Sequence, residues 1–234
     1  MLGESVAASA DPPAWDESVS PRSGSRQATR PLKICFITET LHAGVGQHVV
    51  DASLELSRRG HQVHLIYSPT RCEQRFLASL TDRVHCVPLQ MPHDIRLGDV
   101  STFASIRKYV RAKGPFDIVH GHSSKGGGYA RLLKLFGAGK TVYSPHAFVT
   151  LSPVPGPVKR QAYRTLEWAL ARLTDRIICT SRGELDHACS LDIARERLAL
   201  IPNGGAPMVG PTRSAMRAKL GFSPDQVVVG FAGR

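Results

Sequence analysis

The chain has 234 residues, of which 42% are hydrophobic, which is enough for one sizeable core or for one domain and part of another. No apolar run is long enough to cross a bilayer. The net charge of +11 indicates an anionic partner, such as nucleic acid, lipid headgroups or a phosphorylated substrate. Aromatic residues are few and are not interleaved with basic ones, so we expect no nucleic-acid partner. On charge alone a nucleic-acid binder stays open, and its affinity would fall steeply with salt.

The first 30 residues are rich in Ser, Pro and Ala and poor in bulky side chains, which predicts a disordered tail over 1–30. They lack the basic and apolar blocks of a signal peptide. No two of the cysteines form a C-x-x-C pair, and Cys35 and Cys179 sit in apolar strand patterns, where a thiol is usually a small core residue. The pattern favours a cytoplasmic protein over a disulfide or zinc framework.

Short β-branched runs alternate with helical stretches after residue 31. The predicted strands are 33–39, 62–68, 83–89, 117–122, 141–146, 176–181 and 198–203, and the clearest helical spacings are 48–60, 129–139 and 161–173. This alternation predicts an α/β fold with a Rossmann-like parallel sheet and helices on both faces. We expect this domain to span 31–208, followed by a linker and short helix over 209–226.

A glycine turn follows the first predicted strand. Gly44 and Gly46 flank Val45 in "ETLHAGVGQHVV", and helix N-termini after strands favour anions. Val49 stands where the dinucleotide fingerprint needs a third glycine, no acidic residue closes the second strand, and no Walker lysine follows. NAD, FAD and a Walker loop are therefore not expected. A purely structural tight turn remains an alternative.

The fourth predicted strand ends in "HGHSSKGGG". His120 and His122 are two residues apart and so share a face of the strand. No convincing third ligand accompanies them in the sequence, so we expect no metal, and a neutral histidine that hydrogen-bonds a sugar or the backbone is the favoured interpretation. Ser123 follows the strand, and Lys125 at a glycine-rich helix start could meet a phosphate. The alternative is a loop histidine satisfied by the backbone.

Another histidine, His146, ends the fifth predicted strand. Carboxyl ends of parallel strands meet at one edge of a sheet, so the glycine turn at 44–46, His122 and His146 are expected on the same rim. This convergence predicts a ligand site more strongly than each motif does alone.

Several segments together resemble family 4 glycosyltransferases of the GT-B fold. They are "ETLHAGVGQHVVDASLELSRRGHQVHLI", "FDIVHGHSSKGGGYARLLKLFGAGKTVYSPHAF", "LTDRIICTSRGELDHA", "LIPNGG" and "GFAGR". The segment "HGHSSKGGG…YSPHAF" is similar to bacterial exopolysaccharide and O-antigen members. The resemblance covers roughly residues 32–234.

The resemblance implies a role for each matching residue. Gly44, Val45 and Gly46 would approach the diphosphate of the donor, and His122 would be catalytic, facing the transferred sugar. The "GR" after the first strand of the second domain would place Arg234 on the diphosphate, a task that suits the bidentate fork of arginine. His120, Ser123, Lys125 and His146 are the candidates on the acceptor side.

The resemblance also implies a retaining hexosyl transfer without a cofactor. The donor would be a UDP- or GDP-linked sugar, and the acceptor a glycan or lipid-linked saccharide in cell-surface polysaccharide synthesis. The family pattern continues beyond Arg234, so 227–234 is expected to be the first strand of the donor-binding domain. As a chain ending there, the protein is expected to be inactive, because most of the charge that stabilises the leaving group would be missing.

Basic residues cluster on two predicted helices and suggest an anionic membrane surface as a further partner. The clusters are Arg107, Lys108, Arg111 and Lys113, and Lys159, Arg160 and Arg164. They predict either solvated helix faces or peripheral association with the inner face of the plasma membrane.

Two other functions stay open. One is a non-catalytic saccharide- or lipid-binding module, and the other is a different Rossmann-type enzyme such as a sugar epimerase, which tight NAD binding would support.

Overall fold

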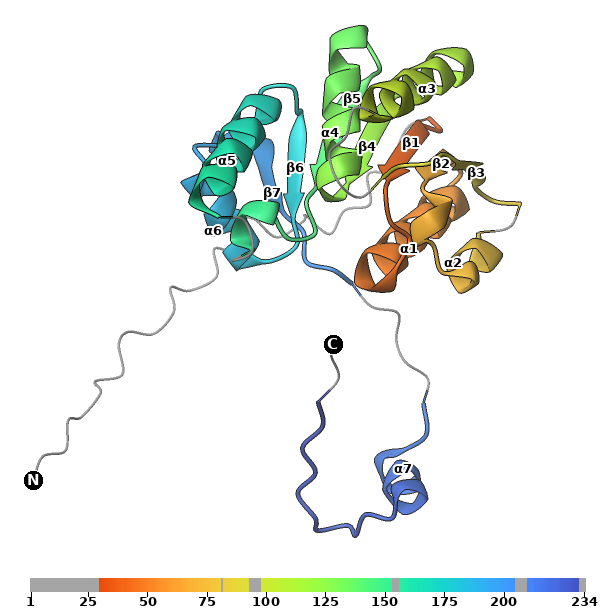
Figure 1. The fold of residues 1–234 in the computed structure, drawn as a ribbon. Coiled ribbons are helices and arrows are strands. Elements are labelled where there is room, and N and C mark those ends of the chain that lie inside the picture. Colours follow the sequence, from red (N-terminus) through yellow and green to blue (C-terminus); the bar gives the residue numbers. More distant parts are fainter. Residues whose placement is uncertain (1–29, 81, 93–97, 153–155, 205–209, 232–234) are drawn as a thin grey trace, which may run out of the picture.

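The computed structural model describes residues 30–80, 82–92, 98–152, 156–204 and 210–231. Each of the seven predicted strands is present in shorter form, and together they build one parallel sheet (Figure 1). The strands are β1 (Lys33–Thr38), β2 (Gln62–Tyr67), β3 (His85–Pro88), β4 (Ile118–His122), β5 (Lys140–Ser144), β6 (Arg176–Cys179) and β7 (Leu198–Leu200). Of the predicted disordered tail over 1–30, only Arg30 is described, and it forms an ion pair with Asp117.

The strand order in the sheet is β3-β2-β1-β4-β5-β6-β7, so the chain runs outward from β1 in one direction and then from β4 in the other. All neighbouring strands are parallel, with Thr38 beside His122 and His122 beside Ser144. This order reverses between β1 and β4, and ligands bind at such a reversal at the carboxyl ends of strands. The Rossmann-like α/β prediction is confirmed.

Six helices connect the strands and cover both faces of the sheet. They are α1 (Ala43–Arg58), α2 (Gln74–Ser79), α3 (Gly98–Lys113), α4 (Ser123–Leu133), α5 (Pro157–Ala171) and α6 (Arg182–Ser190), and α7 (Arg213–Leu220) follows the last strand. Alternate residues of β1 show the two faces: Ile34 and Phe36 pack in the cluster that contains α1, whereas Cys35 and Ile37 pack with α3 and α4. Strands buried on both faces explain the continuous apolar runs in the sequence.

Three helices begin earlier than the sequence spacing predicts. Helix α1 starts at Ala43 and not at residue 48, α4 starts at Ser123 and not at 129, and α5 starts at Pro157 and not at 161. In α1 and α4 the cause is glycine. In a sequence glycine suggests a loop, but here the glycines lie within the first residues of the helices. The end of α1 was predicted correctly, because Gly60 adopts the left-handed conformation of a helix C-terminus with φ of 86°.

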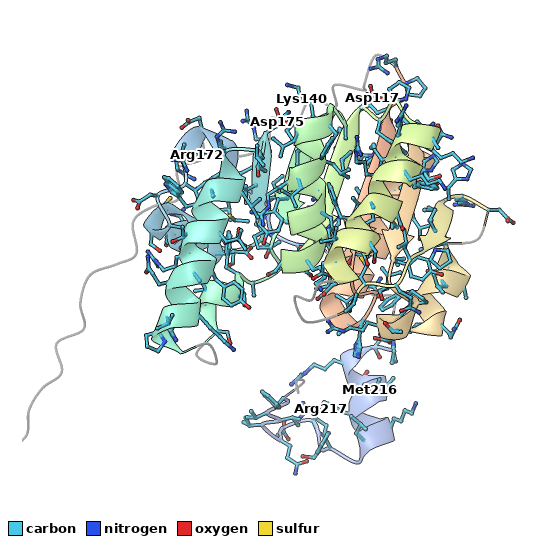
Figure 2. All side chains as sticks on the ribbon, turned by 45° about the horizontal axis from the view of Figure 1, so that its top comes forward. Asp117, Lys140, Arg172, Asp175, Met216 and Arg217 are labelled. Atoms are coloured by element: carbon cyan, nitrogen blue, oxygen red, sulfur yellow. The ribbon has the colours of Figure 1, made fainter. Side chains whose placement is uncertain are left out.

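Carboxylates fix the edge of the sheet at which the strands begin, opposite their carboxyl ends. Asp117 accepts the backbone N–H of Lys33 at 2.7 Å, and Asp175 accepts that of Thr141 at 2.8 Å. Figure 2 shows Asp117, Lys140 and Asp175 along this edge. Ion pairs of Lys134 and Lys140 with Asp175 hold the pKa of that carboxyl near 2, against the opposing effect of burial. These contacts set the strand register that places the site residues at the other edge.

The C-terminal segment lies apart from the sheet, as the labels of Met216 and Arg217 on α7 show (Figure 2). The strand expected at 227–234 is not formed over its described residues 227–231, where Val227 and Phe231 are 90% and 91% exposed. A strand needs a neighbour for its backbone hydrogen bonds, and the described chain offers none here. The proposed division into domains stays a prediction. Within the described ranges no helix combines the length and apolarity that spanning a bilayer requires.

Candidate functional site

Two histidines stand at the carboxyl end of β4, next to the point where the strand order reverses. Their rings stack with centroids 4.1 Å apart, which confirms that both lie on one face of the strand. His120 hydrogen-bonds through Nε2 to Oγ of Ser144 on β5, at 2.9 Å. His122 is fully buried. The side chains of both histidines are therefore buried. A ligand at this rim would contact other residues first.

His146 is one residue of the loop after β5. Its Nε2 lies 3.0 Å from Nδ1 of His122, so one of the two nitrogens donates a proton and the other accepts it. The backbone φ angles of His146 and Ala147 are 53° and 82°, in the left-handed region that non-glycine residues rarely adopt. Such strain often accompanies functional sites. The loop is thus held in a conformation that turns the His146 ring toward His122.

A third imidazole, that of His48, joins this pair from α1. Its ring centroid lies 4.7 Å from that of His146 and 5.7 Å from that of His122. Sequence reasoning missed His48, because a lone histidine on a helix carries no motif. The available signal was its spacing: His48 is four residues after Gly44 and therefore on the same helix face. We call His48, His122 and His146 the histidine cluster.

Burial keeps the histidines of this rim neutral at neutral pH. Loss of solvation, together with the smaller effect of neighbouring imidazoles, lowers the pKa of His120 to about 3 and that of His146 to about 4. The pKa of His122 is lowered well below its usual value by the same causes. For His48 burial also lowers the pKa, against a hydrogen bond to the Asn203 side chain that raises it. The rim therefore offers hydrogen-bonding imidazoles and not fixed positive charges.

These low pKa values predict an acid-sensitive fold. His120 has an ordinary pKa of 6.5 when unfolded and about 3 when folded, so below pH 6.5 the unfolded chain binds more protons. The stabilisation is present above pH 6.5 and is lost as the pH falls toward the folded value. We expect the free energy of unfolding in urea to drop by roughly 1 kcal/mol per pH unit for each such histidine between about pH 6 and pH 4. The variant His120→Gln should show a smaller slope, and an equal slope in both proteins would contradict the assignment.

A cavity of about 540 Å³ opens beside the histidine cluster. It is lined by residues from the starts of two helices and from the loops after β5, β6 and β7: Gly44, Val45, His146, Ala147, Leu151, Thr180, Ser181, Gly183, Glu184 and Asn203. Helix N-termini carry partial positive charge and backbone N–H groups, which favour anions. The cavity therefore suits a phosphate group, and His146 is the member of the cluster that lines it.

Glu184 on α6 organises one wall of this cavity. It is 4% exposed, and its carboxylate accepts the backbone N–H of Ala147 at 2.8 Å and that of Thr180 at 2.6 Å. The Ser181 side chain caps α6 by accepting the N–H of Glu184. Glu184 thus ties the strained loop of His146 to the start of α6. The sequence analysis did not single it out, because an S-x-x-E start is a common helix signal.

The three residues of the predicted glycine turn have different surroundings. Gly44 and Val45 line the cavity, and a Cβ at Gly44 would meet nothing within 4 Å in the described structure. A Cβ at Gly46 would lie 2.6 Å from the Phe76 ring and 2.7 Å from the backbone of Leu41. Gly46 therefore lets α1 pack closely against Phe76 and Leu41, and its contact with the diphosphate stays a prediction.

The other predicted site residues are less close to the cavity. Lys125 is 7% exposed and forms an ion pair with Asp99 at 2.8 Å, which also accepts a hydrogen bond from Tyr129. A phosphate would have to compete with that carboxylate. Ser123 begins α4 with φ of 58° and does not line the cavity. Arg234 lies outside the described residues.

Solved structures with a similar fold include GT-B glycosyltransferases. HepE of Anabaena in complex with UDP-glucose has a TM-score of 0.61 and 17% sequence identity over 81% of this chain and 50% of that protein. A glycosyltransferase from Rickettsia africae gives 0.63 at 12% identity over 85% and 51%, and sucrose-phosphate synthase from Thermosynechococcus elongatus gives 0.62 at 16% over 83% and 53%. The chain thus spans about half the length of each and has the fold of the N-terminal half of a GT-B protein.

The model of glycosyltransferase family 4 matches residues 42–205, a segment that runs from the start of α1 to the end of the cavity wall. The chain belongs to glycosyltransferase family 4, as the sequence motifs predicted. A search of curated proteins found no match.

Proposed function

We propose that this chain forms the N-terminal half of a sugar transferase and holds the diphosphate and sugar of a sugar nucleotide at the edge between β1 and β5. The observation that carries the proposal is the cavity, because the starts of α1 and α6 and the imidazole of His146 all face it. Family membership supports transfer of a sugar as the reaction. The donor would be a UDP- or GDP-linked sugar, and HepE, which shares the fold, has been solved with UDP-glucose.

The geometry supports a division of roles within this site. The backbone N–H groups of Gly44 and Val45, at the start of α1, would meet the diphosphate. His146 lines the cavity and would contact the transferred sugar. His122 is buried behind it and hydrogen-bonds to His146, so it would position that ring and not touch the sugar itself. We propose retention of configuration, and an acceptor that is a glycan or lipid-linked saccharide.

Titration of the chain with UDP-glucose, followed by backbone amide NMR, tests the donor site. We expect the largest shifts at Gly44, Val45 and Gly183 and no saturable shifts in the variant Gly44→Val. A Cβ at Gly44 meets no described atom within 4 Å, and the residue lines the cavity, so the valine side chain should take up space that the donor needs. Gly128→Ala is the matched control, since a Cβ there also meets nothing within 4 Å and the residue does not line the cavity. Saccharide binding without any nucleotide response would favour a binding module instead.

We also propose that the end of α3 and the turn after α4 rest on an anionic membrane. The side chains of Leu135 and Phe136 are 63% and 51% exposed, and Arg107 lies over the Phe136 ring at 4.1 Å. Arg107 and Arg111 line a groove with Phe136, which combines apolar and basic contacts on one surface. This combination is typical of interfacial attachment.

Binding to vesicles containing anionic lipid tests this surface. Each basic residue near such a membrane contributes about 1 kcal/mol, so Arg107→Glu with Arg111→Glu should weaken binding by at least about tenfold and remove most of its salt dependence. Lys219→Glu with Arg213→Glu on α7 makes the same change in charge elsewhere. Equal losses in both double variants would show a general charge effect and would contradict a defined membrane surface.

A further inference from the structure

The outward side of α5 carries a line of apolar residues. Val158, Ala162, Leu166 and Ala169 follow one another at helical spacing and are all exposed. We call these four residues the α5 stripe. Val158 and Leu166 are 83% and 44% exposed, whereas the opposite side of the helix holds its three buried residues. An amphipathic helix normally turns its apolar side to the core, so the α5 stripe is an apolar surface that the core does not use.

Positive charge borders the α5 stripe on both sides. At 100° per residue, Lys159 lies on one side of it near the start of the helix, and Arg172 lies on the other side just after the helix ends. All residues of α5 are described, and its one acidic residue, Glu167, is buried in the ion pair with Arg131. The exposed side of this helix is therefore apolar and basic, with no negative charge.

Trp168 lies between the α5 stripe and Arg172. It is 41% exposed, and the Arg172 guanidinium lies over its ring at 3.3 Å and donates a hydrogen bond to its carbonyl oxygen at 3.1 Å. Figure 2 labels Arg172 at this end of α5. Indole has an apolar body and a polar N–H group, and tryptophan is enriched where a membrane meets water. An indole between an apolar line and a basic side chain fits that boundary.

The neighbouring helices indicate the charge of the surface that would cover α5. Helices α3, α4 and α5 lie side by side on one face of the sheet (Figure 1). With the turn Lys134–Phe136 they contain ten basic and two acidic residues, whereas α1 and α2 on the other face contain two of each. Two copies of this chain would bring like charges together here, so the asymmetry favours an anionic surface over self-association.

One short turn joins the α5 stripe to the candidate site. This turn, Val149–Leu151, lies between β5 and α5. Val149 lines a groove together with Val158 and Lys159, and Leu151 at the other end of the turn lines the cavity beside His146. A surface that covers the α5 stripe therefore reaches the edge of the cavity.

We propose that α5 lies flat on a bilayer that contains anionic lipid. The α5 stripe enters the boundary between headgroups and acyl chains, and Lys159 and Arg172 reach the lipid phosphates while their stems lie along the apolar surface. The inference rests on the membrane surface proposed above for α3 and deepens it, because α3 supplies charge and α5 supplies the apolar contact. This orientation holds the cavity at the level of the headgroups, where a lipid-linked saccharide would present its sugar.

Tryptophan fluorescence of the whole chain tests this contact. The chain has two tryptophans, Trp15 and Trp168, so the variant Trp15→Phe leaves the α5 indole as the only reporter. With vesicles of phosphatidylglycerol and phosphatidylcholine, we expect the emission of Trp168 to shift to the blue and to be quenched by lipids brominated in the upper acyl chain. Sedimentation of the same vesicles measures how much of the chain is bound.

Two matched double variants test the α5 stripe itself. Val158→Ser with Leu166→Ser should weaken vesicle binding by at least about tenfold, because two apolar side chains no longer leave water. Leu220→Ser with Val227→Ser makes the same replacements at residues of the C-terminal segment that are 59% and 90% exposed, and its binding should equal that of the unchanged chain. Circular dichroism of each variant would confirm that the fold is retained.

Several results would overturn the proposal. Sedimentation with vesicles but unchanged emission of Trp168 would remove the contact of α5 and leave the surface on α3 standing, whereas no binding to any vesicle would remove both. An equal response to vesicles of phosphatidylcholine alone would show that anionic lipid is not required. A blue shift that grows with protein concentration in the absence of lipid would assign the α5 stripe to a second copy. Equal losses in the two double variants would show no defined contact.

Discussion

The variant Gly126→Ala should unfold far more easily than the unchanged chain. Gly126 lies in α4 where the helix crosses β1, and an added Cβ would collide with the carbonyl oxygen of Ile37 and come within 3.2 Å of Cα of Thr38. Backbone atoms cannot rotate aside as a side chain can, so the helix must move away from the sheet. Overpacking of this kind typically costs about 1–3 kcal/mol, and we expect the upper end or more.

Gly128→Ala is the matched control for this variant, because the residue lies in the same helix and a Cβ there meets no described atom within 4 Å. Alanine is the better helix former by about 1 kcal/mol, so Gly128→Ala should leave stability unchanged or raise it slightly. Urea unfolding of the two variants measures the difference. Equal stabilities would show that Gly126 is not required for close packing of α4 on β1.

The second large effect concerns a buried ion pair between α4 and α5. Arg131 and Glu167 are 1% and 4% exposed, and their side chains meet at 2.7 Å. Arg131 also donates to the carbonyl of Gly127 and lies over the Tyr143 ring at 4.0 Å. Arg131→Met should destabilise the fold by about 3–5 kcal/mol, because it leaves the carboxylate of Glu167 buried without its partner.

The double variant Arg131→Met with Glu167→Leu separates the ion pair from packing. Replacement of both charges by apolar groups of similar size is often neutral or stabilising, so most of the lost stability should return. Thermal unfolding of the two single variants and the double variant gives the coupling energy. If the double variant is as unstable as the sum of the single ones, the cause is lost packing and not an uncompensated charge.

The strands could be predicted from the sequence because a buried parallel strand is a short continuous apolar run. Helix starts could not, because glycine has two uses that look alike in a sequence. It permits turns, and it permits close contact between a helix and a sheet, which is what Gly46 and Gly126 do here. Residues 227–231 have the composition of a strand, but strand formation depends on a neighbour that a local pattern cannot supply.

The site was partly predictable for a related reason. His122, His146 and Gly44 follow strands, and parallel topology brings such residues to one rim. His48 was missed because its role depends on how α1 lies against β4 and β5. Glu184 was missed because an acidic residue in a first helical turn is usually exposed, whereas here the Ala147 amide and burial give it a structural task.

Transfer of labelled sugar from a sugar nucleotide to a lipid-linked acceptor, measured with the complete gene product, tests the central claim most directly. The unchanged protein should transfer sugar, Gly44→Val should be slower by at least about a hundredfold because the donor is displaced, and Gly128→Ala should be normal. Equal transfer by Gly44→Val and the unchanged protein would contradict a donor site at the start of α1. No transfer from any UDP- or GDP-linked sugar would contradict the proposed activity.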